Sequence, residues 1–168
     1  TFHLYLPQLV APTAPALPEP MPPPPASGRG ETILLVEDEP SVRDVGVVAL
    51  RRFGYRVLTA ASGPEALAVW AGHKDEVRLL LTDLIMPGGM SGLQLARQLA
   101  AEKPGLRVIY TSGYSAEIAG KDHPLREGIN YLPKPYEIDR LFRTVRTALD
   151  RRASFPPTPR LWRRGSRP

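Results

Sequence analysis

Polar residues follow four of the short apolar runs in this chain of 168 residues. Glu37 and Asp38 follow the first run, and Asp83, Ser112 and Lys134 follow three later ones. Carboxylates that lie within a few ångströms of one another raise each other's pKa unless a cation neutralises them. Oxygen ligands in loops without histidine or cysteine favour a hard divalent ion such as Mg²⁺. These residue types indicate a magnesium site, provided that the fold brings them together.

A lysine beside such an acidic group indicates phosphoryl chemistry. A divalent ion and Lys134 together suit the equatorial oxygens of an incoming phosphoryl group, and the hydroxyl of Ser112 is a donor to one of them. One carboxylate is then free to attack phosphorus, as in enzymes that form an aspartyl phosphate. Taken singly, a carboxylate after a strand more often caps a helix, and a loop lysine faces solvent. The hypothesis of phosphoryl chemistry therefore depends on all of these residues occurring together.

Five short apolar runs must position these residues. Continuous apolarity over about four residues is typical of strands that are buried on both faces, as in a parallel sheet covered by helices. Parallel neighbours need helical crossovers, which predicts a doubly wound α/β sheet. In such sheets the functional site lies at the C-terminal ends of the strands. The expected strands are 33–36, 57–60, 79–82, 108–111 and 129–132.

Helix signals lie between and after these strands, and five helices are expected. Pro40 starts one that runs to about Phe53. Ser62 and Glu65 have the spacing of a capping box and start another, which runs to about Ala71. The last helix has one apolar face, made of Ile138, Leu141, Phe142, Val145 and Leu149. Packing roles are expected for Trp70, Met86 and Met90.

The charge of the chain is concentrated at one end. Its formal net charge is +5, yet residues 31–150 hold 15 Lys and Arg against 16 Asp and Glu, whereas residues 151–168 hold six Arg and no acid. We expect this Arg- and Pro-rich tail to be disordered, with contact to an anionic surface as the alternative. No apolar run approaches the ~18 residues of a membrane span, and no signal peptide is evident. The sequence therefore indicates a cytoplasmic protein.

Four segments resemble the signature segments of response-regulator receiver domains: ILLVEDEP, LLLTDLIMPGGMSG, VIYTSGYS and YLPKPY. Asp38 and Asp83 are 45 residues apart, Ser112 follows after 29 more and Lys134 after a further 22, close to that family's spacing. The resemblance covers residues 31–150. It implies a flavodoxin-like fold, a five-stranded parallel sheet of order 2-1-3-4-5 with five helices.

The resemblance also implies a role for each site residue. Asp83 would be phosphorylated, and Asp38, Asp83 and the backbone carbonyl of Ile85 would ligate Mg²⁺, with Glu37 acting mainly through water. Lys134 would pair with the phosphoryl oxygens. The domain would itself be a phosphoacceptor in a two-component phosphorelay rather than a separate enzyme.

A conformational switch follows from the same resemblance. Ser112 would move toward the phosphoryl group and let Tyr131 turn inward, and the Lys134–Pro135 bond would be cis. The changed surface, at roughly residues 115–142, would dock a partner or form a dimer. The phosphodonor would be a histidine kinase or a histidine phosphotransfer protein.

The ends of the chain suggest a larger parent protein. Residues 1–7 resemble the last strand of a kinase ATP-binding domain, and the Pro-rich residues 8–30 read as a linker. The loop 86–92 is one residue longer than usual, as in receivers at the C-terminus of sensor histidine kinases. We therefore expect a fragment of a hybrid histidine kinase whose catalytic core is absent from this chain.

Three other functions are alternatives to this interpretation. A hydrolase of the haloacid dehalogenase type needs D-x-D after the first strand, but Asp38 is followed by Glu39-Pro40. A DNA-binding domain is not expected in the 18 residues after Asp150. The serious alternative is a receiver that docks proteins without being phosphorylated. The complete set of Asp38, Asp83, Ser112 and Lys134 argues against it.

Overall fold

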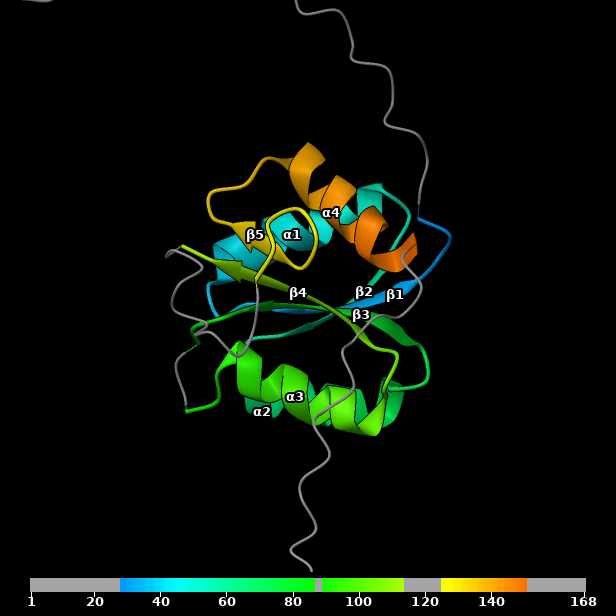
Figure 1. Cartoon of the computed structure of the whole chain (residues 1–168), viewed down its shortest axis with the longest axis vertical. Coiled ribbons are helices and arrows are strands. Elements are labelled where there is room, and N and C mark those ends of the chain that lie inside the picture. Colours follow the sequence, from blue (N-terminus) through cyan, green and yellow to red (C-terminus); the bar gives the residue numbers. More distant parts are fainter. Residues whose placement is uncertain (1–27, 87–88, 114–124, 151–168) are drawn as a thin grey trace, which may run out of the picture.

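A parallel five-stranded sheet forms the centre of the structure, a computed structural model that describes residues 28–86, 89–113 and 125–150 (Figure 1). Its strand order is β2-β1-β3-β4-β5, as predicted. Every neighbouring pair of strands is parallel. The strands are β1 (Thr32–Val36), β2 (Arg56–Ala60), β3 (Val77–Asp83), β4 (Arg107–Ser112) and β5 (Tyr131–Pro133).

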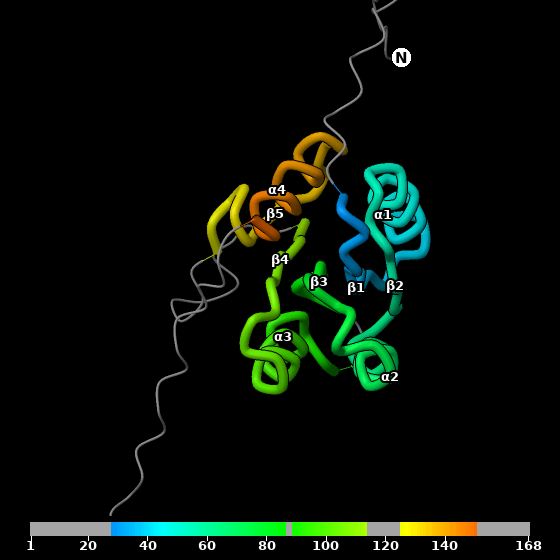
Figure 2. Tube along the Cα trace, turned by 90° about the vertical axis from the view of Figure 1, so that its right-hand side faces the viewer, coloured from blue at the N-terminus to red at the C-terminus, as the bar shows by residue number. Residues whose placement is uncertain are grey.

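Helices cover both faces of this sheet. Figures 1 and 2 show α1 and α4 on one face and α2 and α3 on the other. The helix expected between the fourth and fifth strands falls largely on residues 114–124, outside the described part of the chain. The described helices are α1 (Pro40–Arg52), α2 (Gly63–His73), α3 (Gly92–Glu102) and α4 (Ile138–Asp150).

The fifth strand is shorter than predicted. Ile129 and Asn130 were expected in it, but they lie in a turn before Tyr131. Both residues donate their backbone N–H to the carbonyl of Arg126, and the Asn130 side chain accepts a hydrogen bond of 2.7 Å from the Arg126 N–H. Asparagine often stabilises turns in this way. The apolar character of Ile129 therefore predicted a strand where local hydrogen bonding favours a turn.

The N-termini of α2 and α3 have different capping hydrogen bonds. Ser62 accepts a hydrogen bond from the Glu65 N–H, as predicted, but the Glu65 carboxylate accepts from the Ala61 N–H, which makes the box incomplete. The reciprocal capping box is at α3, where Ser91 and Gln94 each accept a backbone N–H of the other. Sequence analysis overlooked this second pair, although it has the same spacing.

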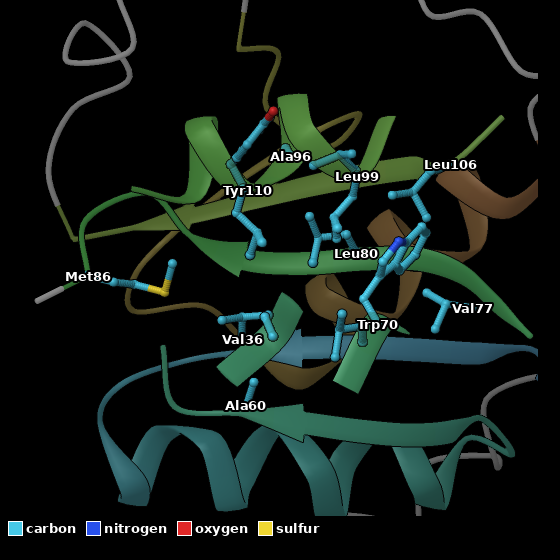
Figure 3. Close-up of a cluster of buried hydrophobic side chains, with 14 of the residues drawn as sticks. Val36, Ala60, Trp70, Val77, Leu80, Met86, Ala96, Leu99, Leu106 and Tyr110 are labelled. Carbon is cyan, nitrogen blue, oxygen red and sulfur yellow. The ribbon is translucent and has the colours of Figure 1, made fainter. Parts of the chain in front are cut away.

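The apolar core has two parts, one on each face of the sheet. Trp70 and Met86 belong to the part under α2 and α3, and Figure 3 shows them at opposite ends of that cluster. Trp70 is 2% exposed, and its indole N–H donates to Glu102 at 3.0 Å. Under α1 and α4, Phe53 and Phe142 stack with ring centroids 4.2 Å apart. The packing roles expected for Trp70 and Met86 are confirmed.

One residue of the predicted apolar face of the last helix is exposed. Ile138, the first residue of α4, is 50% exposed, whereas Leu141 and Val145 are fully buried. Among the described residues, no helix is both long and apolar enough to cross a membrane.

Candidate functional site

The register of the sheet brings the predicted site residues to one edge. Val36 is paired with Thr82, and Asp83 with Thr111. Ser112 is in turn paired with Pro133. The residues that follow these positions, including Glu37 and Lys134, therefore lie side by side at the C-terminal ends of the strands. This edge is where the doubly wound fold was predicted to place the chemistry.

Three carboxylates converge at this edge. One oxygen from each of Glu37, Asp38 and Asp83 can be chosen so that all three lie within 4.8 Å of one another. Glu37 is 3% exposed and Asp83 is 9% exposed, so water screens their negative charges only in part. Burial raises the pKa of the Glu37 carboxyl, and the charge of Asp83 acts in the same direction, whereas Lys134 opposes both.

Lys134 neutralises two of these carboxylates directly. Its Nζ lies 2.6 Å from Oε2 of Glu37 and 2.6 Å from Oδ2 of Asp83. Burial by itself would lower the pKa of Lys134, but the hydrogen bonds to Asp83 and Glu37 outweigh burial and raise it. The lysine therefore stays protonated at neutral pH and provides a fixed positive charge in the site.

Both carboxylate oxygens of Asp83 accept hydrogen bonds from other parts of the site. Its Oδ1 accepts the backbone N–H of Ile85 at 3.1 Å, while Oδ2 accepts from Lys134. Its backbone carbonyl accepts the hydroxyl of Thr82 at 3.0 Å. A Cβ atom at Gly92 would overlap that same carbonyl oxygen, so Gly92 allows α3 to start against the end of β3. Sequence analysis did not single out Gly92.

The donor set of the cluster fits a hard divalent cation. The three side chains offer only carboxylate oxygens, which are the ligands that Mg²⁺ prefers. Ile85, whose backbone carbonyl was the fourth predicted ligand, lies two residues after Asp83 in the chain and is 48% exposed. The structure therefore brings together all the carboxylates that sequence analysis predicted for a metal site.

Ser112 and Tyr131, the two predicted switch residues, are both buried. Ser112 is 1% exposed, and its carbonyl accepts the Lys134 N–H at 2.8 Å. Tyr131 is 4% exposed and packs in the cluster under α2 and α3. Burial raises the pKa of the Tyr131 phenol, and the negative charge of Asp83 contributes to the rise. The Lys134–Pro135 peptide bond is cis, as the resemblance implies.

Arg43 contacts the acidic loop and was also missed. From the first turns of α1, its Nη1 donates to the carbonyl of Glu37 at 2.7 Å and to that of Asp38 at 3.4 Å. An arginine on a helix is usually read as a solvent-facing residue. Only the way the chain turns back from β1 into α1 reveals this contact.

Comparison with known proteins identifies the family. The family model described as "Response regulator receiver domain" matches residues 33–146. The chain is 39% identical over 120 residues to the sensor kinase CckA of Brucella abortus (strain 2308), a match that covers 71% of this chain and 13% of CckA. Three other curated relatives are likewise longer, with matches that cover between 25% and 53% of their lengths.

Solved structures give the same result. The receiver domain of the hybrid histidine kinase CckA superposes with a TM-score of 0.59 at 36% identity, over 70% of this chain and 98% of that domain. The response regulator TrrA of Thermotoga maritima, solved in complex with Mg(2+)-BeF, superposes with a TM-score of 0.62 at 29% identity, over 71% and 99% of the two chains. Because the family match spans well over half of its residues, the chain belongs to the response regulator receiver domain family.

Proposed function

We propose that the chain is the phosphoacceptor of a two-component phosphorelay, in which Asp83 accepts a phosphoryl group from a phosphohistidine in the presence of Mg²⁺. The observation that carries this proposal is the convergence of Glu37, Asp38 and Asp83 with Lys134, whose Nζ bridges two of the three carboxylates. A carboxylate nucleophile, an acidic pocket for a divalent ion and a fixed cation are the parts that phosphoryl transfer to aspartate needs.

The transfer is an in-line displacement at phosphorus. A carboxylate oxygen of Asp83 forms the new O–P bond while the P–N bond to the donor imidazole breaks. The imidazole nitrogen keeps the electron pair of the broken bond, and the donor returns to ordinary histidine. Lys134, already 2.6 Å from Asp83 Oδ2, is placed to donate to a phosphoryl oxygen as negative charge gathers there.

Asp38, Asp83 and the backbone carbonyl of Ile85 would hold the Mg²⁺, with Glu37 acting mainly through water. When bound, the ion supplies positive charge for the phosphoryl oxygens. Glu37 then serves chiefly to balance charge, since it already contacts Lys134 at 2.6 Å. The complex of TrrA with Mg(2+)-BeF supports a Mg²⁺ site in this chain by similarity.

Phosphorylation would then bias a two-state equilibrium through Ser112 and Tyr131. Tyr131 is already buried in this structure, so phosphorylation is expected to stabilise the buried arrangement of the ring. The output surface would include the described residues 125–142. A cavity of about 560 Å³ lies there, lined by Gly128, Pro135 and Arg140 among others, and Pro135 directly follows Lys134. The same surface would dock a partner or a second copy.

The similarity to CckA also supports a hybrid histidine kinase as the parent protein. In that arrangement residues 31–150 would be the receiver domain and residues 8–30 the linker that joins it to the kinase, with residues 1–7 as the last strand of the kinase's ATP-binding domain. Residues 151–168 would be a basic tail. The phosphodonor would be a histidine kinase or a histidine phosphotransfer protein in the cytoplasm.

Acetyl phosphate provides a direct test of the phosphoacceptor role. The purified chain is incubated with acetyl phosphate with and without Mg²⁺, and intact mass spectrometry counts the phosphoryl groups that are added. One Mg²⁺-dependent adduct is expected for the wild type and none for Asp83→Asn, which keeps the shape but removes the nucleophile. No adduct on the wild type, under conditions that label a known receiver, would favour the phosphorylation-independent docking module instead.

A further inference from the structure

The loop between β1 and α1 presents two of the three carboxylates, and its shape is not fixed by a helix cap. Glu39, the N-cap residue of α1, makes no side-chain capping hydrogen bond, and the first turn of the helix holds no acidic residue. Glu37 continues the sheet through its N–H, which donates to the Ala60 carbonyl at 3.1 Å. The carbonyl groups of Glu37 and Asp38 lie beyond the end of β1, so their hydrogen-bond donor has to come from outside that strand.

Arg43 supplies that donor. Its Nη1 lies 2.7 Å from the Glu37 carbonyl oxygen and 3.4 Å from that of Asp38. Arg43 is half-buried, and a hydrogen bond from a charged guanidinium is stronger than one between neutral groups. One guanidinium thus restrains two successive peptide groups, and these set the direction in which the Asp38 and Glu37 side chains leave the backbone.

We infer that Arg43 is a positioning residue for the divalent cation site, an inference that rests on the proposed function. It would act through the backbone, by holding the acidic loop in the conformation in which Glu37 and Asp38 face Asp83. Groups that orient metal ligands in this way usually change metal affinity about 10- to 100-fold when they are removed.

Two effects of removing Arg43 have opposite signs, which makes the inference testable. If Arg43 only contributed positive charge near the site, its loss would strengthen the binding of a cation, because one repulsive charge would disappear. If it positions the ligands, its loss would weaken binding despite that change. The direction of the change in Mg²⁺ affinity therefore distinguishes the two roles.

The experiment titrates Mg²⁺ alone into the full chain and follows backbone amide NMR shifts of the site. Arg43→Met removes the donors and the charge but keeps an unbranched apolar side chain, and it should weaken Mg²⁺ binding by about tenfold or more. Arg43→Lys keeps a charged donor and should recover most of the affinity. The matched control is Arg51→Met on the exposed side of the same helix, which should bind Mg²⁺ within about twofold of the wild type.

A second measurement separates positioning from a general loss of stability. At saturating Mg²⁺, the rate of phosphorylation of Arg43→Met by acetyl phosphate should return close to the wild-type rate, because only the formation of the cation site is affected. Wild-type or tighter Mg²⁺ binding by a folded Arg43→Met protein would overturn the inference alone. Absence of Mg²⁺ binding by the wild type would overturn the proposed function, and the inference with it.

Discussion

Lys134 and Asp83 are 51 residues apart in the chain, yet Nζ of the lysine lies 2.6 Å from Oδ2 of the aspartate. The same Nζ contacts Glu37, 97 residues away. This bridge joins the ends of β1, β3 and β5. It is therefore both part of the site and a link from β5 to β1 and β3, two strands that are not its neighbours in the sheet.

Replacing Lys134 by methionine should destabilise the protein. Glu37 and Asp83 would keep their negative charges in a largely buried place without a partner, and we expect a loss of about 2 kcal/mol in the free energy of unfolding at neutral pH. Addition of Mg²⁺ should stabilise this variant more than the wild type, since Lys134 no longer competes for the same oxygens. Urea unfolding with and without Mg²⁺ measures both effects.

Lys74→Met is the matched control for this change. Lys74 is exposed, so the variant loses a positive charge away from the site. Its stability should remain within about 0.5 kcal/mol of the wild type, with an ordinary response to Mg²⁺. An equal gain from Mg²⁺ in wild type and Lys134→Met would show that the lysine and the ion do not share the carboxylates.

Gly92→Ala should disturb the site by displacing the backbone at Asp83. The added Cβ would overlap the backbone carbonyl of Asp83 and lie 3.0 Å from the hydroxyl oxygen of Thr82, so β3 and α3 must move apart. We expect a loss of about 1 to 3 kcal/mol in stability, as for other overpacking changes, and slower phosphorylation of Asp83. Thermal unfolding and the acetyl phosphate assay measure the two effects.

Gly72→Ala tests whether that result is specific. Gly72 lies near the end of α2, and a Cβ there would meet no atom within 4 Å. Alanine in a helix should stabilise the protein by about 0.5 to 1 kcal/mol and leave phosphorylation unchanged. If Gly92→Ala behaved like Gly72→Ala, the close approach of α3 to Asp83 would have no functional consequence.

The sequence predicted those features that arise from periodic patterns and from motifs. Apolar runs gave the sheet, and the residues at the ends of the runs gave Asp83 and Lys134, because parallel strands bring their C-terminal ends to one edge. The start of the fifth strand was placed two residues too early, since hydrogen bonds around Asn130 decide between turn and strand there. Patterns of hydrophobicity do not contain that information.

Contacts made through the backbone were not predictable in the same way. Arg43 acts on two carbonyl oxygens, and Gly92 acts by lacking a side chain beside a third. Neither effect depends on the type of the residue that is contacted, so no pair of residue types in the sequence reveals it. The side chains that converge in the site could be identified in advance, whereas these two backbone contacts could not.

Lys103 should contribute to stability without affecting the site. Its Nζ donates to the carbonyl oxygens of Lys74, Asp75 and Val77 at 2.6, 3.2 and 2.7 Å, which fixes the turn from α2 into β3 at the edge opposite the site. Lys103→Met should lower the free energy of unfolding by about 1 kcal/mol, because the part-buried Val77 carbonyl loses its donor while water can replace the lysine at the two exposed carbonyl groups. Phosphorylation of the folded variant should keep the wild-type rate; a slower rate would show that the two edges of the sheet are coupled.

Arg146 should make the stability of the domain depend on pH. It pairs with Glu31, before β1, at 2.9 Å and with Asp150, at the end of α4, at 2.8 Å. Burial acts to raise the pKa of Glu31, but the hydrogen bonds from Arg146 and the Arg29 backbone outweigh burial and lower it. A carboxyl whose pKa is lower in the folded state adds stability above its unfolded pKa, and this contribution is lost as the pH falls through the folded pKa.

Arg146→Met should therefore cost about 1 to 2 kcal/mol at pH near 7. The cost should fall progressively as the pH drops below the ordinary pKa of a glutamate, about 4.3, and through the lowered pKa of folded Glu31. Urea unfolding of wild type and variant across this range gives the difference at each pH. Arg143→Met, on the exposed side of the same helix, removes the same charge and should show a small difference that changes little with pH. If Arg146→Met lowered the stability equally at pH 7 and at the lowest pH, the aliphatic stem of Arg146 would stabilise the domain by packing. The ion pair with Glu31 would then contribute nothing measurable.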